Sequence, residues 1–171
     1  MSNRILLVED DQSFGAVLKD YLTINNFEVN LATDGEQGLK EFTENEFDIC
    51  IFDVMMPKKD GFSLAEDVKR IDKNIPIIFL TARNMREDIL KGYQLGADDY
   101  ITKPFTDIEL LNAIDSRLKK IKILKKEYTS DPQGIQEMMN EFGELNTLDN
   151  ITENREENHY KKKQAIYMEG N

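Results

Sequence analysis

Polar and charged side chains follow four apolar runs of the sequence, each at the point where a predicted strand ends. They are Glu9, Asp10, Asp53, Thr81 and Lys103. Carboxylates gathered without compensation would have raised pKa values and would destabilise a fold, so this group makes physical sense around a cation. A hard, oxygen-seeking Mg²⁺ fits the set best.

Asp53 is the candidate nucleophile of this group. Mg²⁺ prefers one or two carboxylates together with water and phosphate oxygens, which leaves Asp53 free to present its other oxygen. Lys103 and Thr81 would supply an ammonium and a hydroxyl to the charged oxygens of a transferring phosphoryl group. The pattern therefore favours phosphoryl transfer to a protein carboxylate.

Each residue taken alone has a structural explanation. Asp10 or Asp11 could be a helix N-cap, and residues 53–57 could be a strand-to-turn boundary. Lys103-Pro104 could be a surface turn whose proline is cis. Because the whole set occurs at successive strand ends, separate structural roles are strongly disfavoured relative to a common site.

Short apolar runs alternate with helical patterns, and these elements would position the site. A helix beginning near Asp11 would carry one apolar stripe, and similar stripes fill the other gaps. The alternation predicts a doubly wound α/β domain with a parallel sheet and its active site at the carboxyl ends of the strands. The five predicted strands are Ile5 to Val8, Glu28 to Ala32, Ile49 to Phe52, Ile77 to Leu80 and Tyr100-Ile101, and the stripe is Phe14, Val17, Leu18, Tyr21 and Leu22.

The 171 residues suit one domain with a tail, and the formal net charge of -11 disfavours direct binding of nucleic acid by this chain. The single Cys50 lies in an apolar run and reads as a buried residue of a reducing compartment. The amino-terminal apolar run is too short for a signal peptide or a membrane span. We expect a cytoplasmic protein that does not contact a membrane.

The tail begins with an extension of the last helix of the domain. That helix starts near Asp107, and its apolar spacing allows either a short coiled coil or an ordinary amphipathic helix. Ser130-Asp131-Pro132 offers an N-cap and a first-turn proline to a further helix. The apolar stripe of that helix must pack on the domain, on a second copy of the chain or on a partner.

Four segments resemble the signatures of response-regulator receiver domains of two-component systems, which are CheY-like. The resemblance covers residues 1–122 and implies a flavodoxin-like, five-stranded parallel sheet in the order 2-1-3-4-5. Residues 123–171 then form a helical extension that is a linker, a tail or the start of a truncated effector domain. The segments are residues 5–11, 53–61, 80–82 and 96–105.

The resemblance also implies roles for single residues. Asp53 would be phosphorylated by a partner sensor histidine kinase, with Mg²⁺ held by Glu9, Asp10, Asp53 and the backbone carbonyl of Met55. Lys103 would pair with the phosphate.

Four side chains take regulatory roles by resemblance. Thr81 and Tyr100 would form a linked switch that responds to phosphorylation. The side chains of Met55 and Arg83 would overhang the pocket and tune dephosphorylation.

The family implies a phosphoacceptor switch with self-phosphorylation and self-dephosphorylation chemistry rather than an enzyme. The output would be dimerisation or an effector response, with transcriptional regulation favoured and a homodimer formed through the last helices of the domain or through the tail. Residues 160–171 are similar to the opening strand of cyclic-nucleotide-binding domains of the catabolite-activator type, although a solvated charge run explains them equally well.

Three other readings compete. A haloacid-dehalogenase-type phosphatase needs a carboxyl two residues after its nucleophile, where this chain has Met55. A flavodoxin-like cofactor module needs a phosphate loop after the first strand, where this chain has acidic residues. A phosphorylation-independent docking module would leave the complete acidic pocket without a purpose.

Overall fold

A computed structural model of the chain describes residues 2–82, 99–126 and 131–143. The chain divides into two compact units, residues 1–110 and 111–171, which are described separately below. The predicted division into a domain over residues 1–122 and an extension over residues 123–171 stays a prediction. The last described helix of the first unit, α5, crosses from one unit into the other.

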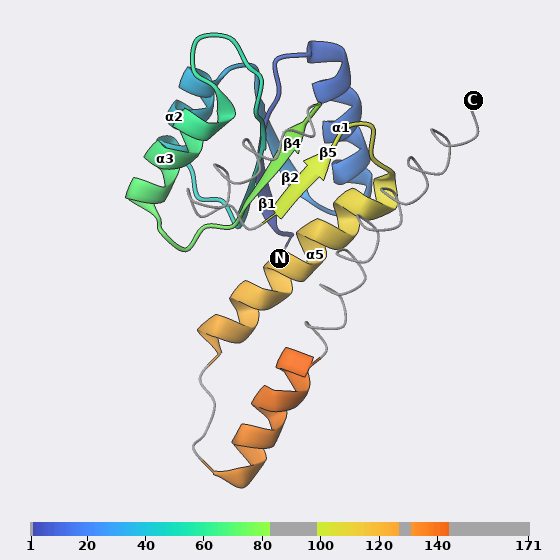
Figure 1. The fold of residues 1–171 in the computed structure, drawn as a ribbon, viewed down its shortest axis with the longest axis vertical. Helices are drawn as coiled ribbons and strands as arrows, with labels where there is room; N and C mark the ends of the chain where they lie inside the picture. Colours follow the sequence, from blue (N-terminus) through green and yellow to red (C-terminus); the bar gives the residue numbers. More distant parts are fainter. Residues whose placement is uncertain (1, 83–98, 127–130, 144–171) are drawn as a thin grey trace, which may run out of the picture. The chain divides into compact units, whose positions relative to one another are not determined.

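The centre of the first unit is a parallel sheet of five strands in the order β2-β1-β3-β4-β5 (Figure 1). This result confirms the fold class and the sheet order that the sequence predicted. Each strand begins or ends within one residue of its predicted boundary. The strands are β1 (Arg4–Val8), β2 (Glu28–Ala32), β3 (Ile49–Asp53), β4 (Ile77–Thr81) and β5 (Asp99–Thr102).

The register of the strands brings their carboxyl ends to one edge of the sheet. Val8 at the end of β1 lies beside Phe52 of β3, and Asp53 lies beside Leu80 of β4. Thr81 in turn lies beside Thr102 of β5. Residues that follow these four strands are therefore neighbours in space, although they are far apart in sequence.

Helices cover both faces of the sheet, with α1 on one face and α2 and α3 on the other (Figure 1). Three of them begin with an aspartate N-cap whose carboxylate accepts hydrogen bonds from backbone N–H groups of the first turn. The cap of α1 is Asp11, as the sequence suggested. The helices are α1 (Gln12–Ile24), α2 (Gly35–Glu44), α3 (Gly61–Ile71) and α5 (Asp107–Lys125), and the other two caps are Asp34 and Asp60.

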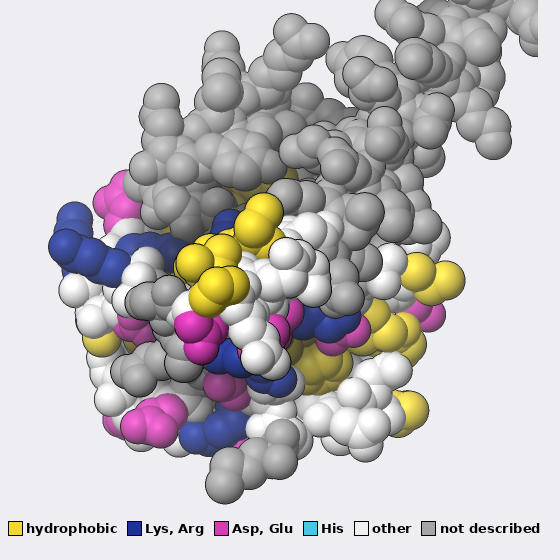
Figure 2. All heavy atoms as spheres, turned by 90° about the horizontal axis from the view of Figure 1, so that it is seen from below, with side chains coloured by type: hydrophobic (Ala, Val, Ile, Leu, Met, Phe, Trp, Pro, Cys, Tyr) yellow, Lys and Arg dark blue, Asp and Glu magenta, His cyan; other side chains and the backbone are white. Residues whose placement is uncertain are grey.

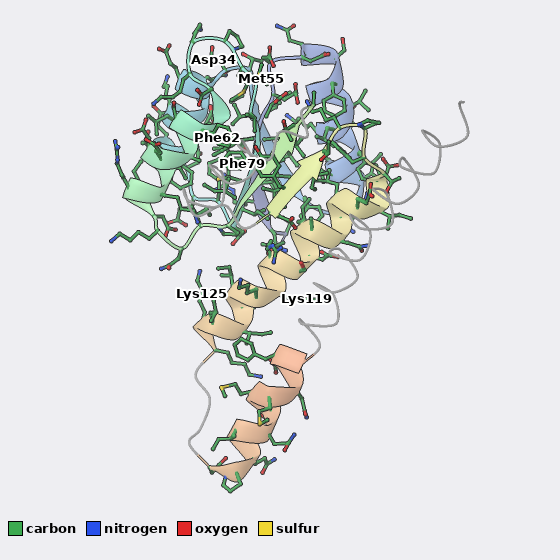
Figure 3. All side chains as sticks on the ribbon, viewed as in Figure 1. Asp34, Met55, Phe62, Phe79, Lys119 and Lys125 are labelled. Carbon is green, nitrogen blue, oxygen red and sulfur yellow. The ribbon has the colours of Figure 1, made fainter. Side chains whose placement is uncertain are left out.

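The core on the α2 and α3 face is aromatic at its centre. The ring of Phe79 lies 5.0 Å from the ring of Phe62 and 5.5 Å from the ring of Tyr100, centroid to centroid. Figure 3 shows Phe62 and Phe79 pointing toward one another inside the domain. Cys50 belongs to the same cluster and is fully buried, and burial raises the pKa of its thiol.

The apolar stripe predicted for α1 is only partly directed at the core. Leu18 and Leu22 are buried, but Val17 is 67% exposed and Phe14 is half-buried. The apolar stripe is wider than the part of α1 that the sheet covers. Val17 and Phe14 at its edges therefore remain partly exposed, which is common for single apolar side chains.

The second unit contains the end of α5 and a helix over residues 132–143. Asp131 caps that helix by accepting a hydrogen bond from the N–H of Gly134 at 2.7 Å, and Pro132 occupies its first turn. Lys126 and Glu141 form an ion pair of 2.6 Å. Lys119 and Lys125 project from α5 (Figure 3).

Apolar side chains remain exposed on the helix over residues 132–143. They are Ile135, Met139 and Phe142. The face shown in Figure 2 mixes apolar, basic and acidic side chains rather than presenting a continuous basic stripe. Across the described residues, no helix combines the length and apolar character needed to cross a bilayer.

Gly61, the first residue of α3, packs against the acceptor strand. A Cβ there would collide with the carbonyl oxygen of Asp53, which belongs to rigid backbone. We expect Gly61→Ala to lower the free energy of unfolding by about 2–4 kcal/mol, measured by urea denaturation. Gly15→Ala is the control, because a Cβ there meets chiefly the movable side chain of Leu31. Equal stability of the two variants would contradict this packing.

Candidate functional site

Glu9 and Asp10 follow β1 and differ sharply in burial. The Glu9 side chain is 1% exposed, and its backbone N–H donates to the carbonyl of Ala32 at 3.0 Å. Asp10 is exposed, and the N–H of Asp11 donates to Oε1 of Glu9 at 3.3 Å. The turn into α1 therefore holds one buried carboxylate and one accessible carboxylate side by side.

Asp53 is the last residue of β3 and is 6% exposed. Its Oδ1 accepts a hydrogen bond of 2.9 Å from the backbone N–H of Met55. The next residue, Val54, donates its N–H to the carbonyl of Leu80 in β4 and accepts one from Gly61. Backbone contacts on both sides thus fix the direction of the Asp53 carboxylate.

Lys103 joins the strand ends. Its ammonium donates to Oε2 of Glu9 at 2.7 Å and to Oδ2 of Asp53 at 2.8 Å. Its backbone N–H donates to the carbonyl of Thr81 at 2.6 Å. One residue after β5 is therefore bonded to Asp53 of β3, to Thr81 of β4 and to Glu9, which follows β1.

The electrostatics of the group follow from this burial. Removal from water raises the pKa of Glu9 to about 7, and the nearby charge of Asp53 adds to that effect, while Lys103 opposes it. For Lys103, burial alone would lower the pKa of the ammonium, but its hydrogen bonds to Asp53 and Glu9 outweigh burial and raise it.

Three carboxylates converge at this edge of the sheet. Glu9, Asp10 and Asp53 each offer one oxygen atom, and these atoms lie within 4.8 Å of one another. A set of carboxylate oxygens with one exposed member fits a hard divalent cation that keeps part of its water. The chemistry of the donors therefore agrees with the Mg²⁺ expected from the sequence.

The other predicted site residues differ in burial. Thr81 is fully buried at the end of β4, and the Tyr100 ring is buried within the core. Met55 is 53% exposed and lies at the upper edge of the domain in Figure 3. Arg83 lies outside the described residues, and its predicted role stays a prediction.

The loop after β3 is tied to the start of α2, which the sequence analysis did not anticipate. Lys58 has a φ of 64°, a left-handed conformation in which most residues are strained. Its ammonium bonds to Oδ2 of Asp34 at 2.6 Å, while Oδ1 of Asp34 caps α2. The contact spans 24 positions of sequence, and no local spacing could have indicated it.

A second unanticipated contact involves Phe14, whose ring centroid lies 4.6 Å from the ammonium of Lys103. The sequence pattern places Phe14 in the apolar stripe of α1 and does not indicate a part in the site. The only available signal was its position, three residues after the N-cap Asp11, which places it in the first turn above the carboxyl end of β1.

Residues 5–115 match the family model of the response regulator receiver domain. Among curated proteins, the chain is 52% identical over 119 residues to transcriptional regulatory protein RprY of Bacteroides fragilis, covering 70% of this chain and 50% of that protein. It is 42% identical over 118 residues to transcriptional regulatory protein CpxR of Escherichia coli, covering 69% and 50%. The chain thus spans about half the length of these curated relatives.

Solved structures agree with this match. A CheY-like receiver domain protein from Methanospirillum hungatei superimposes with a TM-score of 0.69 at 28% identity, covering 71% of this chain and 98% of that one. The non-phosphorylated HemR receiver domain from Leptospira biflexa gives 0.65 at 35% identity, covering 68% and 94%.

The raised pKa of Glu9 links stability to pH. The folded chain holds this proton more tightly than the unfolded chain, so the contribution is complete below the ordinary pKa of 4.5 and is lost as pH rises through about 7. We expect the unfolding free energy of the metal-free chain to fall by up to about 3 kcal/mol over that range. Urea denaturation in a chelator at several pH values measures the fall.

Glu9→Gln should abolish most of this pH dependence and stabilise the metal-free chain at neutral pH. Glu46→Gln, which neutralises an exposed carboxylate, should leave the dependence unchanged. A Glu9→Gln variant with the pH dependence of the parent chain would show that another group is responsible.

Proposed function

Because this chain belongs to the response regulator receiver domain family, we propose that Asp53 accepts a phosphoryl group from a phosphohistidine of a partner sensor histidine kinase. The observation that carries the proposal is the ammonium of Lys103, bonded at once to the buried carboxylates of Glu9 and Asp53. Receiver domains are signalling modules rather than enzymes with a released product. The self-phosphorylation and self-dephosphorylation chemistry is part of the proposal.

Glu9, Asp10, Asp53 and the backbone carbonyl of Met55 are the groups that would hold Mg²⁺. Their carboxylate oxygens supply the hard donors that this ion prefers, and Asp10 leaves the site accessible. When bound, the ion supplies positive charge to the oxygens of the transferring phosphoryl group.

In the proposed transfer, a carboxylate oxygen of Asp53 attacks phosphorus as the bond from phosphorus to the imidazole nitrogen breaks. The imidazole leaves with the electron pair of that bond. The ammonium of Lys103 lies within hydrogen-bond distance of the acceptor carboxylate and so can stabilise the negative charge on the phosphoryl oxygens during transfer. The hydrogen bond from the N–H of Met55 holds the other carboxylate oxygen in place.

The response to phosphorylation would pass through Thr81 and Tyr100. Phosphorylation adds about -1.5 to -2 charge units and new acceptor oxygens, which can draw the hydroxyl of Thr81 toward the site. Tyr100 packs on Phe79, which lies two residues before Thr81 in β4. A displacement of Thr81 can therefore be transmitted through Phe79 to the ring of Tyr100. Met55 and Arg83 would tune dephosphorylation through access to water.

The relatives named as transcriptional regulatory proteins suggest that the output is transcriptional control. DNA binding would then lie in a separate domain, in keeping with the net charge of -11 on this chain. Dimerisation through the last helices of the domain or the tail, and a cytoplasmic location, complete the proposal.

One position of the sequence argues against the hypothesis of a haloacid-dehalogenase-type phosphatase. Met55 stands two residues after Asp53, where that enzyme class needs a carboxyl group, and its exposed thioether cannot donate or accept a proton. The docking-module reading makes a different prediction, since it requires no phosphoryl acceptance.

Intact mass after incubation with acetyl phosphate and Mg²⁺ tests the proposed function. We expect the chain to gain one phosphoryl group, because the carboxylate of Asp53 can act as a nucleophile beside the ammonium of Lys103. Asp53→Asn should abolish the gain, whereas Asp20→Asn, at an exposed position of α1, should not alter it. Absence of a Mg²⁺-dependent gain in the parent chain would favour the docking module.

A further inference from the structure

Besides its two carboxylates, the ammonium of Lys103 lies over an aromatic ring. The ring centroid of Phe14 lies 4.6 Å from the ammonium nitrogen, within the range of a cation–π interaction. Phe14, Lys103, Pro104 and Phe105 line one open hollow of the surface. The contact therefore lies where solvent and a phosphodonor can reach the lysine.

Two features hold the Phe14 ring in this place. Its backbone N–H donates to Oδ1 of the N-cap Asp11 at 3.0 Å, which fixes the first turn of α1. Its ring meets the ring of Phe105 edge-on, with centroids 6.1 Å apart and planes at 67°. Leu18 and Leu22 of the same helix are buried, whereas Phe14 is only half-buried and stands at the site.

We propose that Phe14 is a positioning residue for phosphoryl transfer, whose ring face holds the ammonium of Lys103 at the acceptor carboxylate. This inference rests on the proposed function. Phe14 acts through its contact with Lys103 rather than on the acceptor carboxylate itself.

An aromatic face suits this task better than a polar side chain. An ammonium has three N–H donors, and the carboxylates of Glu9 and Asp53 accept from two of them. The ring attracts the positive charge through its quadrupole without acting as a strong hydrogen-bond acceptor. The ammonium thus stays partly shielded from water and can turn from Glu9 toward an arriving phosphoryl oxygen.

Lys103 is fixed at its backbone but not along its side chain. The carbonyl of Thr81 accepts a hydrogen bond from the backbone N–H of Lys103, so the flexible methylene chain is the part whose conformation the Phe14 ring would restrict. A lysine stem carries many rotamers, and contact with one ring removes several of them before the reaction begins. The expected benefit is a higher rate of phosphorylation rather than tighter binding of metal.

The test compares the parent chain with Phe14→Leu, Phe14→Met, Phe14→Tyr and Tyr21→Leu. Acetyl phosphate drives phosphorylation over a series of Mg²⁺ concentrations, and intact mass gives the rate. We expect Phe14→Leu and Phe14→Met to lower the rate at saturating Mg²⁺ by about threefold to fivefold. The Mg²⁺ concentration for half-maximal rate should not rise.

Phe14→Tyr retains the ring and should stay within about twofold of the parent rate. Tyr21→Leu removes a half-buried ring from the same helix away from Lys103 and should do the same. Equal rates for Phe14→Leu, Phe14→Met and the parent would overturn the inference, as would an equal loss in Tyr21→Leu. Failure of the parent itself to be phosphorylated would instead overturn the proposed function.

A second measurement needs neither metal nor phosphoryl transfer. The ring current of Phe14 should move the NMR signals of the Lys103 ε-methylene protons upfield in the metal-free chain, with Lys103→Met identifying the signals. Phe14→Leu should abolish the displacement and Phe14→Tyr should preserve it. Signals at the same position in the parent and in Phe14→Leu would show that the ring does not hold the ammonium.

Discussion

The ammonium of Lys103 lies between the carboxylates of Glu9 and Asp53 at the carboxyl edge of the sheet and offsets part of their negative charge. Both carboxylates are almost fully removed from water, and a buried charge without a partner is strongly destabilising. Asp53 is the last residue of β3, while Glu9 and Lys103 directly follow β1 and β5, so the contact exists only if these strands are parallel and correctly registered. Sheet topology and site chemistry therefore depend on the same contact.

The surrounding turns show how the chain supports this edge. Aspartates cap α1, α2 and α3, and each cap satisfies backbone N–H groups directly after a loop at the site. Asp34 has a second task, because its ion pair with Lys58 ties the loop that carries Met55 to the start of α2. These contacts hold the charged side chains of the loops at fixed positions above the core.

The positions of the strands and the convergence of Glu9, Asp53 and Lys103 could be predicted from the sequence. Apolar runs alternate regularly with amphipathic helices, and parallel topology sends the residues after each strand to one edge. The contacts from Phe14 to Lys103 and from Asp34 to Lys58 could not be predicted, because they join side chains from separate loops and depend on rotamers. The exposure of Val17 could not be predicted either, because an apolar stripe in the sequence does not indicate how much of the helix surface the sheet covers.

The burial of Cys50 has a practical consequence for experiments on this protein. It is the only cysteine of the chain, and its thiol is both inaccessible and held in the protonated form, which reacts slowly with maleimides and iodoacetamides. A cysteine introduced on the exposed face of the helix over residues 132–143 would therefore accept a spectroscopic probe selectively in the folded protein. Site-directed labelling can follow this chain through a signalling cycle without first removing a native thiol from its core.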